Sequence, residues 1–369
     1  MDSIVREIVT RSGAEPRVPE SPTQSIGMGA EDAELERILA SLRTNIKILG
    51  IGGGGCNTID RLVESGIVGA ELFAANTDAQ HLLTIRSPHK LLLGRRVTRG
   101  LGAGALPQVG EESAREAADE LRSVVQGADM IFITCGLGGG TGTGGAPVVA
   151  QLAKEAGALT IAICTFPFRA EGAIRAENAE FGLEKLRNFA DTVVVIPNDK
   201  LLELVPRLAL NAAFRVADDV LMRAIKGITE VITKPGLVNL DFNDIKTIMK
   251  GGGVAMIGLG ESDRDNRSEE AIEEAINSPL IDVDISHATG ALVNVTGGND
   301  MSVAEAEKVA EIVQGRIAPN ARIIWGAAVD PTLEHKLRVM LILTGVKSKQ
   351  ILGPGEHLRA PYAGVDIVR

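Results

Sequence analysis

The stretch that decides the fold is residues 128–145, ADMIFITCGLGGGTGTGG, which continues as APVV. Residues 130–134 are apolar and rich in β-formers, which predicts a buried strand. A glycine-rich loop follows, and then an apolar-periodic helix with Pro147 in its first turn, where proline is tolerated. Glycines let backbone N–H groups approach an anion, and a helix start adds partial positive charge. The stretch therefore predicts a phosphate cradle, to which the hydroxyls of Thr141 and Thr143 can add donors.

Other interpretations of this loop are weaker. A flexible linker has a similar composition, but linkers do not connect a buried strand directly to a helix. No Gly-Lys-Ser/Thr follows, so the loop is not a Walker A motif. It contains one G-x-G-x-x-G at Gly140, Gly142 and Gly145, which is a weak signal by itself.

Composition narrows the classes of function. The chain has 369 residues, enough for two domains with proper cores. A net charge of −10 and an aromatic content of 3% argue against a nucleic-acid partner. Cys56, Cys135 and Cys164 have no C-x-x-C spacing, which predicts free thiols in a reducing cytoplasm. No apolar run approaches membrane-spanning length, so we expect no direct membrane insertion.

A second glycine loop, GIGGGGCN at residues 50–57, lies between a predicted strand at 46–49 and a predicted helix at 58–65. About 20 residues later the chain reads Asn76-Thr-Asp78, where a dinucleotide-binding protein carries an acid for a ribose hydroxyl. An NAD-dependent metabolic enzyme on a doubly wound fold is therefore an alternative at this point. A third glycine loop, TRGLGAG, follows at residues 98–104, before a helix of mixed charge that ends near Val125.

Further predicted strands at 159–164 and 192–196 alternate with helices, which indicates a doubly wound parallel sheet. Ligands of such sheets bind at the carboxyl ends of the strands, and several glycine loops there suit a polyphosphate. Glu171 and Arg175, four residues apart, are either a helix-surface ion pair or contacts to ribose and phosphate.

A single long helix is predicted at residues 208–234, spanning about 40 Å. Its wide apolar stripe indicates a spine buried on more than one side, and Pro235-Gly236 ends it. A second domain then has predicted strands at 253–259, 291–296, 321–327 and 337–344, with helices at 267–277 and 302–315. Ser302 and Glu305 form a capping box for the last helix.

Five motifs recur in a fixed order along the chain. They are GGGGCN at 52–57, NTDAQ at 76–80, RGLGAG at 99–104, GGGTGTG at 138–144 and NLDFND at 239–244. Together they resemble FtsZ, the tubulin-like family of cell-division GTPases, over roughly residues 44–346. Several segments look most like the archaeal branch of that family.

The resemblance implies a doubly wound parallel-sheet GTPase domain at 44–207, a long central helix at 208–236 and a second, smaller α/β domain at 237–346. It leaves residues 1–43 as an extension, partly disordered with a short helix at 31–43. Residues 347–369 are left as a flexible tail.

The resemblance also assigns the ligand, GTP or GDP with Mg²⁺. No residue is assigned as a direct metal ligand. The nucleotide-binding residues that it implies are Gly53, Gly54, Gly55, Cys56, Asn57, Asn76, Asp78, Gly102, Ala103, Gly104, Gly138, Gly139, Gly140, Thr141, Gly142, Thr143, Gly144, Glu171, Arg175, Phe214 and Asp218.

Phe214 would stack on guanine and Asp218 would read its edge, where many bacterial relatives carry Asn. A carboxylate accepts from both N1–H and the exocyclic amine of guanine but faces a bare lone pair in adenine. Without the resemblance, Phe214 would be a core residue and Asp218 a solvated polar residue on the spine helix.

Asn239, Asp241 and Asp244 are the implied catalytic residues, acting on the nucleotide of a neighbouring subunit in a head-to-tail homopolymer. Asp241 and Asp244 also fit a helix N-cap and its third helical position. The resemblance further implies a division ring at mid-cell in the cytoplasm and a membrane-tethering adaptor. The adaptor would bind the C-terminal tail, whose alternative is a frayed terminus.

Overall fold

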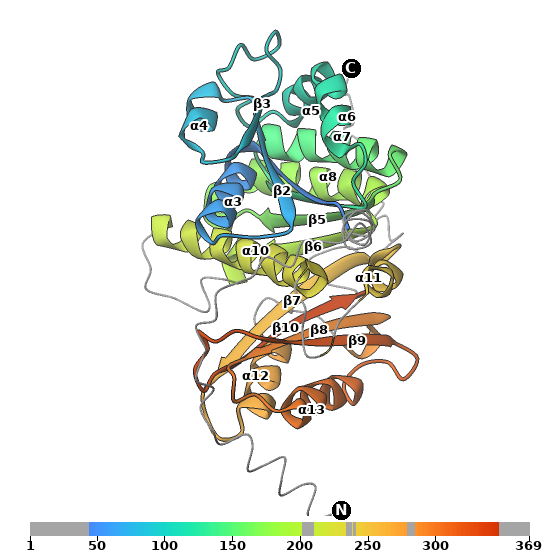
Figure 1. The fold of residues 1–369 in the computed structure, drawn as a ribbon. Coiled ribbons are helices and arrows are strands. Elements are labelled where there is room, and N and C mark those ends of the chain that lie inside the picture. Colours follow the sequence, from blue (N-terminus) through green and yellow to red (C-terminus); the bar gives the residue numbers. More distant parts are fainter. Residues whose placement is uncertain (1–43, 201–209, 234–237, 239–240, 279–284, 347–369) are drawn as a thin grey trace, which may run out of the picture. The chain divides into compact units, whose positions relative to one another are not determined.

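The computed structural model describes residues 44–200, 210–233, 238, 241–278 and 285–346 (Figure 1). They all belong to the unit Thr44–Arg369, one of the two into which the chain divides. The predicted helix at 31–43 and the predicted tail at 347–369 lie outside the described residues.

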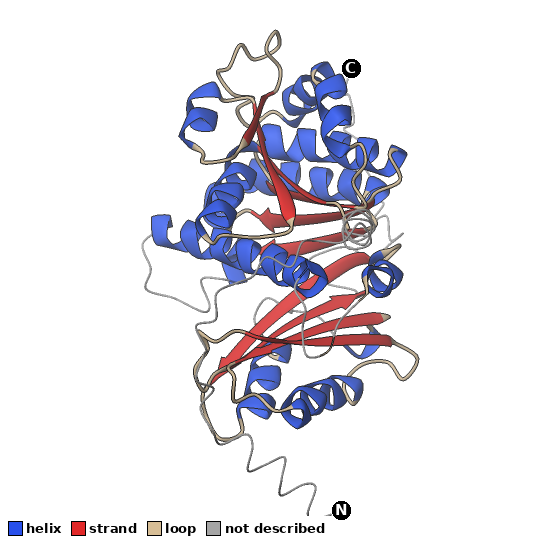
Figure 2. Cartoon of the chain, viewed as in Figure 1, coloured by secondary structure: helices blue, strands red, loops and turns tan. Residues whose placement is uncertain are grey.

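The described strands form one sheet in the order β3-β2-β1-β4-β5-β6-β7-β10-β8-β9 (Figure 2). Their bounds are β1 Ile46–Ile51, β2 Ala70–Asn76, β3 His89–Leu92, β4 Met130–Gly136, β5 Leu159–Phe166, β6 Thr192–Pro197, β7 Gly253–Ser262, β8 Gly290–Gly297, β9 Arg322–Val329 and β10 Leu337–Thr344. The first six strands are parallel in the order 3-2-1-4-5-6, which is doubly wound. This confirms the predicted fold class.

Helices cover both faces of the parallel strands. The described α-helices are α3 Gly52–Glu64, α4 Ala79–Thr84, α5 Pro107–Glu116, α6 Ala118–Val125, α7 Thr141–Glu155, α8 Ala173–Phe189, α10 Leu210–Thr233, α11 Phe242–Met249, α12 Arg267–Ile276 and α13 Val303–Gln314. Helices α5 to α8 share one buried apolar cluster with the sheet, and α3, α4, α10 and α11 share another on the opposite face. The mixed-charge helix expected to run to Val125 is two helices, because the backbone leaves helical geometry at Ala117.

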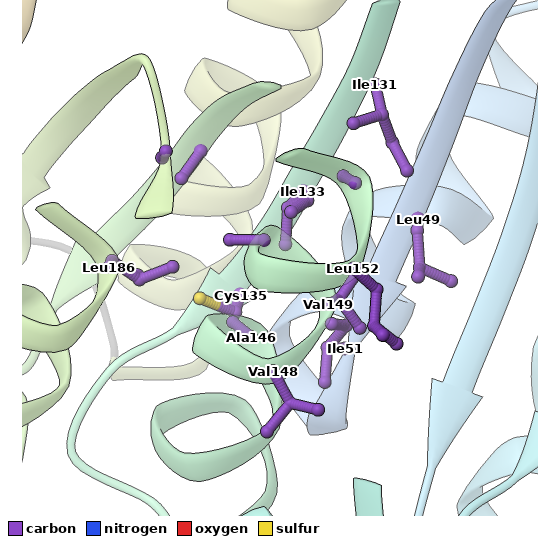
Figure 3. Packing of buried hydrophobic residues seen from close by; sticks show 14 of the residues in the cluster. Leu49, Ile51, Ile131, Ile133, Cys135, Ala146, Val148, Val149, Leu152 and Leu186 are labelled. Carbon is purple, nitrogen blue, oxygen red and sulfur yellow. The ribbon is translucent and has the colours of Figure 1, made fainter. Parts of the chain in front are cut away.

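Helix α7 is the centre of the first cluster, as Figure 3 shows. Val149 and Ala146 pack against Ile51 of β1 and Cys135 of β4, and all four are completely buried. A helix buried this deeply holds the glycine loop before it in a fixed place relative to the sheet. The strand–loop–helix order inferred from residues 128–145 is therefore confirmed.

Helix α10 is the predicted spine. Leu221, Ala224 and Ile228 are almost fully buried, in a cluster that includes Ile48 of β1 and Ile342 of β10. The helix therefore packs on strands from both halves of the chain, which is why its apolar stripe is so wide. The residues on either side of it, 201–209 and 234–237, are outside the described part.

The second half continues the same sheet. Strand β7 pairs in parallel with the start of β6, Thr192 opposite Gly253, and antiparallel with β10. Strand β8 pairs antiparallel with β10 and parallel with β9, and α12 and α13 cover one face through a third apolar cluster. The predicted capping box at α13 is present, with Ser302 Oγ accepting from the Glu305 amide at 3.3 Å. None of the described helices has the length and apolarity that crossing a bilayer requires.

Candidate functional site: a phosphate cradle beside a polar cavity

The strand order reverses between β1 and β4, and both glycine loops lie at the carboxyl ends of these two strands. Helix α3 begins directly after β1, and α7 begins four residues after β4. Neither helix start has a side-chain cap, and neither has an acidic residue in its first turn. The first-turn N–H groups of both helices are therefore left for an anion at the switch point of the sheet.

The glycines of these loops fall into two groups. In the first group a Cβ would collide with backbone: at Gly55 it would lie 2.2 Å from Thr134 O, and at Gly144 it would lie 1.9 Å from Pro107 O. In the second group, a Cβ on Gly53 or Gly139 would meet nothing within 4 Å, and neither residue has a positive φ. Packing explains the first group. The second group faces open space, where a ligand can approach the backbone.

Gly104 of the third loop also faces open space, with φ +56°. The backbone of this loop is tied to the other motifs. Gly102 N donates to Thr77 O at 3.1 Å, and Gly140 N donates to Gly104 O at 2.8 Å. In the first loop, a Cβ on Gly52 would lie 2.9 Å from Gly142 N, so the three glycine motifs are brought together as predicted.

The two threonine hydroxyls of the main loop are used inside the protein. Thr141 Oγ1 lies 2.6 Å from Thr77 Oγ1, and Thr143 Oγ1 accepts from the Gly138 amide at 2.9 Å. Both hydroxyls therefore brace the loop. An accepting hydroxyl keeps its own proton, so their role as donors to the anion stays a prediction. Their backbone groups remain at the start of α7.

Cys56 also contributes no side chain to the cradle. Its thiol is fully buried, 3.5 Å from Ala75 O, and burial raises the pKa of Cys56 to about 12. The buried thiol is inert. A nucleotide could contact only its backbone.

A histidine that sequence reasoning missed connects three predicted site residues. His81 Nδ1 lies 3.1 Å from Asn76 Nδ2, and His81 Nε2 lies 3.0 Å from Asn57 Oδ1. The Asn76 amide donates, since its Oδ1 already accepts from Thr77 N at 2.9 Å, so the imidazole carries its proton on Nε2. Asp78 caps α4 by accepting from the His81 amide at 3.0 Å. A histidine at the third position of a short helix gave no sequence signal.

Glu171 and Arg175 form the ion pair that one interpretation predicted, Arg175 Nη1 to Glu171 Oε2 at 2.8 Å. They also lie at the cradle, because a Cβ on Gly138 would be 2.9 Å from Arg175 O. The Phe168 amide donates to Glu171 Oε1 at 2.9 Å, which fixes the carboxylate. The pair is therefore positioned beside the glycine loop and not on a remote surface.

Predicted base-binding residues line a polar cavity of about 540 Å³ that runs along α3 from Asn57, in its second turn, to Glu64 at its end. Its lining residues are Asn57, Asp60, Arg61, Glu64, Arg86, Phe214, Arg215 and Asp218. The side chain of Asn57 lies in this cavity, and its helix carries the first glycine loop. A larger depression of about 810 Å³ between the ends of α3 and α4 contains none of the predicted site residues.

Phe214 is 37% exposed and meets Phe168 edge-on, with ring centroids 5.1 Å apart. A partly exposed aromatic ring that is held by a second ring suits stacking on a base. Burial raises the pKa of Asp218 to about 6, although Arg61 beside it acts in the opposite direction. Arg61 Nε lies 3.7 Å from Asp218 Oδ2, and its Nη1 contacts Asp219 at 2.9 Å. Sequence reasoning missed Arg61, because nothing in the mixed polar and apolar sequence of α3 marks it as a site residue.

Asn198 is a second residue that sequence reasoning missed. It follows β6 at the same edge of the sheet and is 4% exposed, and its Oδ1 has no hydrogen-bond partner among the described residues. A buried acceptor without a partner is uncommon and marks a place where a ligand or water completes the hydrogen bonding.

Asp241 and Asp244 lie elsewhere. Asp241 caps α11, accepting from the Asn243 amide at 3.0 Å, and Asp244 accepts from the Asp241 amide at 3.4 Å. Both are exposed. Helix α11 lies beyond the C-terminal end of α10, whereas Phe214 and Asp218 are in its first half (Figure 1). The structure therefore does not bring these carboxylates to the cavity of their own chain, and Asn239 is outside the described residues.

Comparison with known proteins gives a consistent result over the whole chain. Residues 45–206 match the model of the Tubulin/FtsZ family GTPase domain, and residues 253–347 match that of the FtsZ family C-terminal domain. The cell division protein FtsZ 1 of Archaeoglobus fulgidus is 57% identical over 100% of both chains. The cell division protein FtsZ of Haloferax mediterranei is 58% identical over 90% of this chain and 88% of its own.

Among solved structures, an empty FtsZ dimer from M. jannaschii has 53% identity and a TM-score of 0.82, over 86% of this chain and 92% of that one. CetZ2 from Haloferax volcanii, at 22% identity and a TM-score of 0.72, shares the fold. Nothing in these comparisons supports the NAD-dependent alternative. The chain belongs to the FtsZ family of tubulin-like GTPases, and its similar relatives are archaeal.

Proposed function

We propose that this chain binds GTP at the switch point of its sheet and hydrolyses it within head-to-tail filaments that serve cell division. The observation that carries the proposal is the meeting of two uncapped helix starts with a polar cavity that Asn57 and Asp218 share. The uncapped N–H groups hold phosphates, and the cavity holds the base. Family membership supplies the GTPase activity, and the geometry of the cradle and the cavity supports this placement of the phosphates and the base.

Guanine is recognised by Phe214 and Asp218. The exposed face of Phe214 stacks on the ring, and the carboxylate of Asp218 accepts from N1–H and the exocyclic amine. With a pKa of about 6, Asp218 is ionised at pH 7 and able to accept both bonds. Glu171 and Arg175, placed beside Gly138, contact ribose and phosphate.

Mg²⁺ accompanies the phosphates. Among the described residues no three acidic, histidine or cysteine side chains gather to form a metal site. Mg²⁺ needs few protein ligands when phosphate oxygens and waters complete its octahedron, so the site suits a nucleotide-borne ion. Bound there, it would neutralise charge on the phosphates.

The hydrolytic carboxylates come from a second subunit. Asp241 and Asp244 are exposed at the far end of α10 from the base cavity, so they can reach only the nucleotide of another chain. GTP hydrolysis proceeds through a loose transition state, in which orienting water and balancing charge are the main tasks. Asp244, whose capping bond is long at 3.4 Å, is the freer of the two carboxylates to orient water.

The test uses Asp241→Asn and Asp244→Asn, because asparagine retains N-capping while removing charge. We expect GTP affinity of the monomer within a few-fold of wild type, persistent filaments, and turnover lower by about 10²-fold. Asp263→Asn, the same change at an exposed site of the same half, is the control. Lost GTP binding, or wild-type turnover in both variants, would contradict the shared site.

We also propose that filaments assemble at mid-cell in the cytoplasm and that residues 350–369 bind a membrane-tethering adaptor. An apolar and charged end after a Gly- and Pro-containing spacer suits a peptide that docks in a groove of its partner. Deleting residues 350–369 should leave GTPase activity and filaments intact and abolish recruitment to membranes by the adaptor. A truncated chain that no longer polymerises would place the tail in the filament instead.

A further inference from the structure

Asn178, in the second turn of α8, holds two loops at once. Its Nδ2 donates to Ala105 O at 3.0 Å and to Gly138 O at 3.3 Å. Ala105 directly follows the glycine loop at 98–104, and Gly138 begins the motif at 138–144, more than thirty residues further along the chain. Both protons of one amide group are thereby used on two segments that have no element of regular structure in common.

Both of these carbonyls lie next to glycines of the proposed phosphate cradle. Ala105 directly follows Gly104, and Gly138 directly precedes Gly139. Gly104 and Gly139 are two of the glycines that face open space at the cradle. Asn178 therefore fixes the backbone on either side of the opening through which a ligand approaches.

The loop that Asn178 holds needs an external constraint. Arg99, Gly100, Gly102 and Gly104 all have positive φ, and no other stretch of six described residues has four such residues. Glycines impose little conformational preference, so the loop position depends on its tertiary hydrogen bonds. Between this loop and the main glycine loop, the other tie is Gly140 N to Gly104 O.

We propose that Asn178 is a positioning residue for nucleotide binding: it sets the spacing between the loop at 102–106 and the loop at 138–140, and so the fit of the phosphates. The inference rests on the proposed binding of GTP at these loops. Asn178 itself need not touch the nucleotide. Neither the glycine motifs nor the other predicted site residues include it.

The test compares Asn178→Ala with Asn188→Ala, the same substitution on the same helix at an exposed position remote from the loops. Asn178→Leu, which keeps the number and branching of the side-chain heavy atoms but has no donors, separates lost hydrogen bonds from lost packing. Two measurements are made on each variant: amide hydrogen exchange of residues 102–110 and 137–146 in the nucleotide-free protein, and the dissociation rate constant of bound GTP.

We expect both Asn178 variants to exchange faster in the two loops and to release GTP about 10-fold faster, the loss expected for one or two net hydrogen bonds. The Michaelis constant should rise while turnover at saturating GTP changes little. Asn188→Ala should match wild type in every measurement.

Different results would contradict the role of Asn178 and the proposed binding of GTP. Unchanged exchange, or faster exchange with unchanged GTP release, would overturn the positioning role while leaving GTP binding intact. A wild-type protein that binds no guanine nucleotide would overturn the proposed function itself. A merely structural role would lower the unfolding temperature without changing GTP release far below it.

Discussion

Gly139 and Gly144 lie five residues apart in the same motif, and an alanine at each should have opposite consequences. At Gly139 the added Cβ meets nothing within 4 Å, and the residue has no positive φ. At Gly144 it would lie 1.9 Å from Pro107 O and 2.6 Å from Glu111 N, both backbone atoms of α5. One methyl group therefore enters the proposed phosphate position, and the other enters a helix–helix contact.

The magnitudes follow from these distances. Gly139→Ala should leave the free energy of unfolding unchanged or raise it by about 0.5 kcal/mol, because alanine reduces the entropy of the unfolded chain. It should weaken GTP binding at least about 10-fold, since blocking one charge-assisted hydrogen bond to phosphate costs about 1.5–3 kcal/mol. Gly144→Ala should destabilise the fold by about 3 kcal/mol or more, because α5 must move away from α7.

The assay is urea unfolding of each nucleotide-free variant, followed by equilibrium titration with GTP on the same preparations. The two variants should separate: Gly139→Ala is stable and binds weakly, and Gly144→Ala is unstable. Wild-type GTP affinity in Gly139→Ala would refute the cradle. A Gly144→Ala protein as stable as wild type would refute the division of the glycines into packed and open groups.

Two further predictions concern titrating groups. The folded-state pKa of Asp218, about 6, is above its ordinary value of 3.8, so its stability contribution is present below about pH 4 and lost as the pH rises through 6. Asp218→Asn should therefore raise the free energy of unfolding at pH 7 by up to about 3 kcal/mol, and this gain should vanish near pH 4. The GTP affinity of the wild-type protein should fall below pH 6, where Asp218 becomes protonated. Cys56, Cys135 and Cys164 are buried with raised thiol pKa values, so a thiol reagent should label none of them at pH 8 until urea unfolds the protein; labelling of the native protein would contradict that burial.

Local signals made much of the fold predictable. A buried strand, glycines and an apolar-periodic helix occur together in residues 128–145, and each acts within a few residues of the next. The helix start at Asp241 was predictable for the same reason, and the capping bonds are present. The continuity of the sheet across the two halves was less predictable from the sequence, because the pairing of β6 with β7 covers only residues 192–194 and 253–255.

The parts of the site that are formed by backbone were predictable from the sequence, and the parts formed by side-chain contacts were less so. The glycine loops were identified by composition, but the contacts of the Thr141 and Thr143 hydroxyls inside the protein were not predicted. Thr77 is more than sixty residues from Thr141 in the chain, so no local sequence pattern predicts their contact. His81, Arg61 and Asn178 were missed for the same reason, since each acquires its role from a partner on another element.

The proposed shared active site is tested most directly by GTP turnover per subunit across a wide dilution series. Asp241 and Asp244 are exposed and remote from the cavity proposed to hold their own chain's nucleotide. If they are the hydrolytic carboxylates, an isolated subunit has none at its own nucleotide. We predict turnover close to zero at low concentration and a steep rise above a critical concentration, where filaments first sediment. Turnover per subunit that stays constant across the series would contradict a site completed by a second subunit.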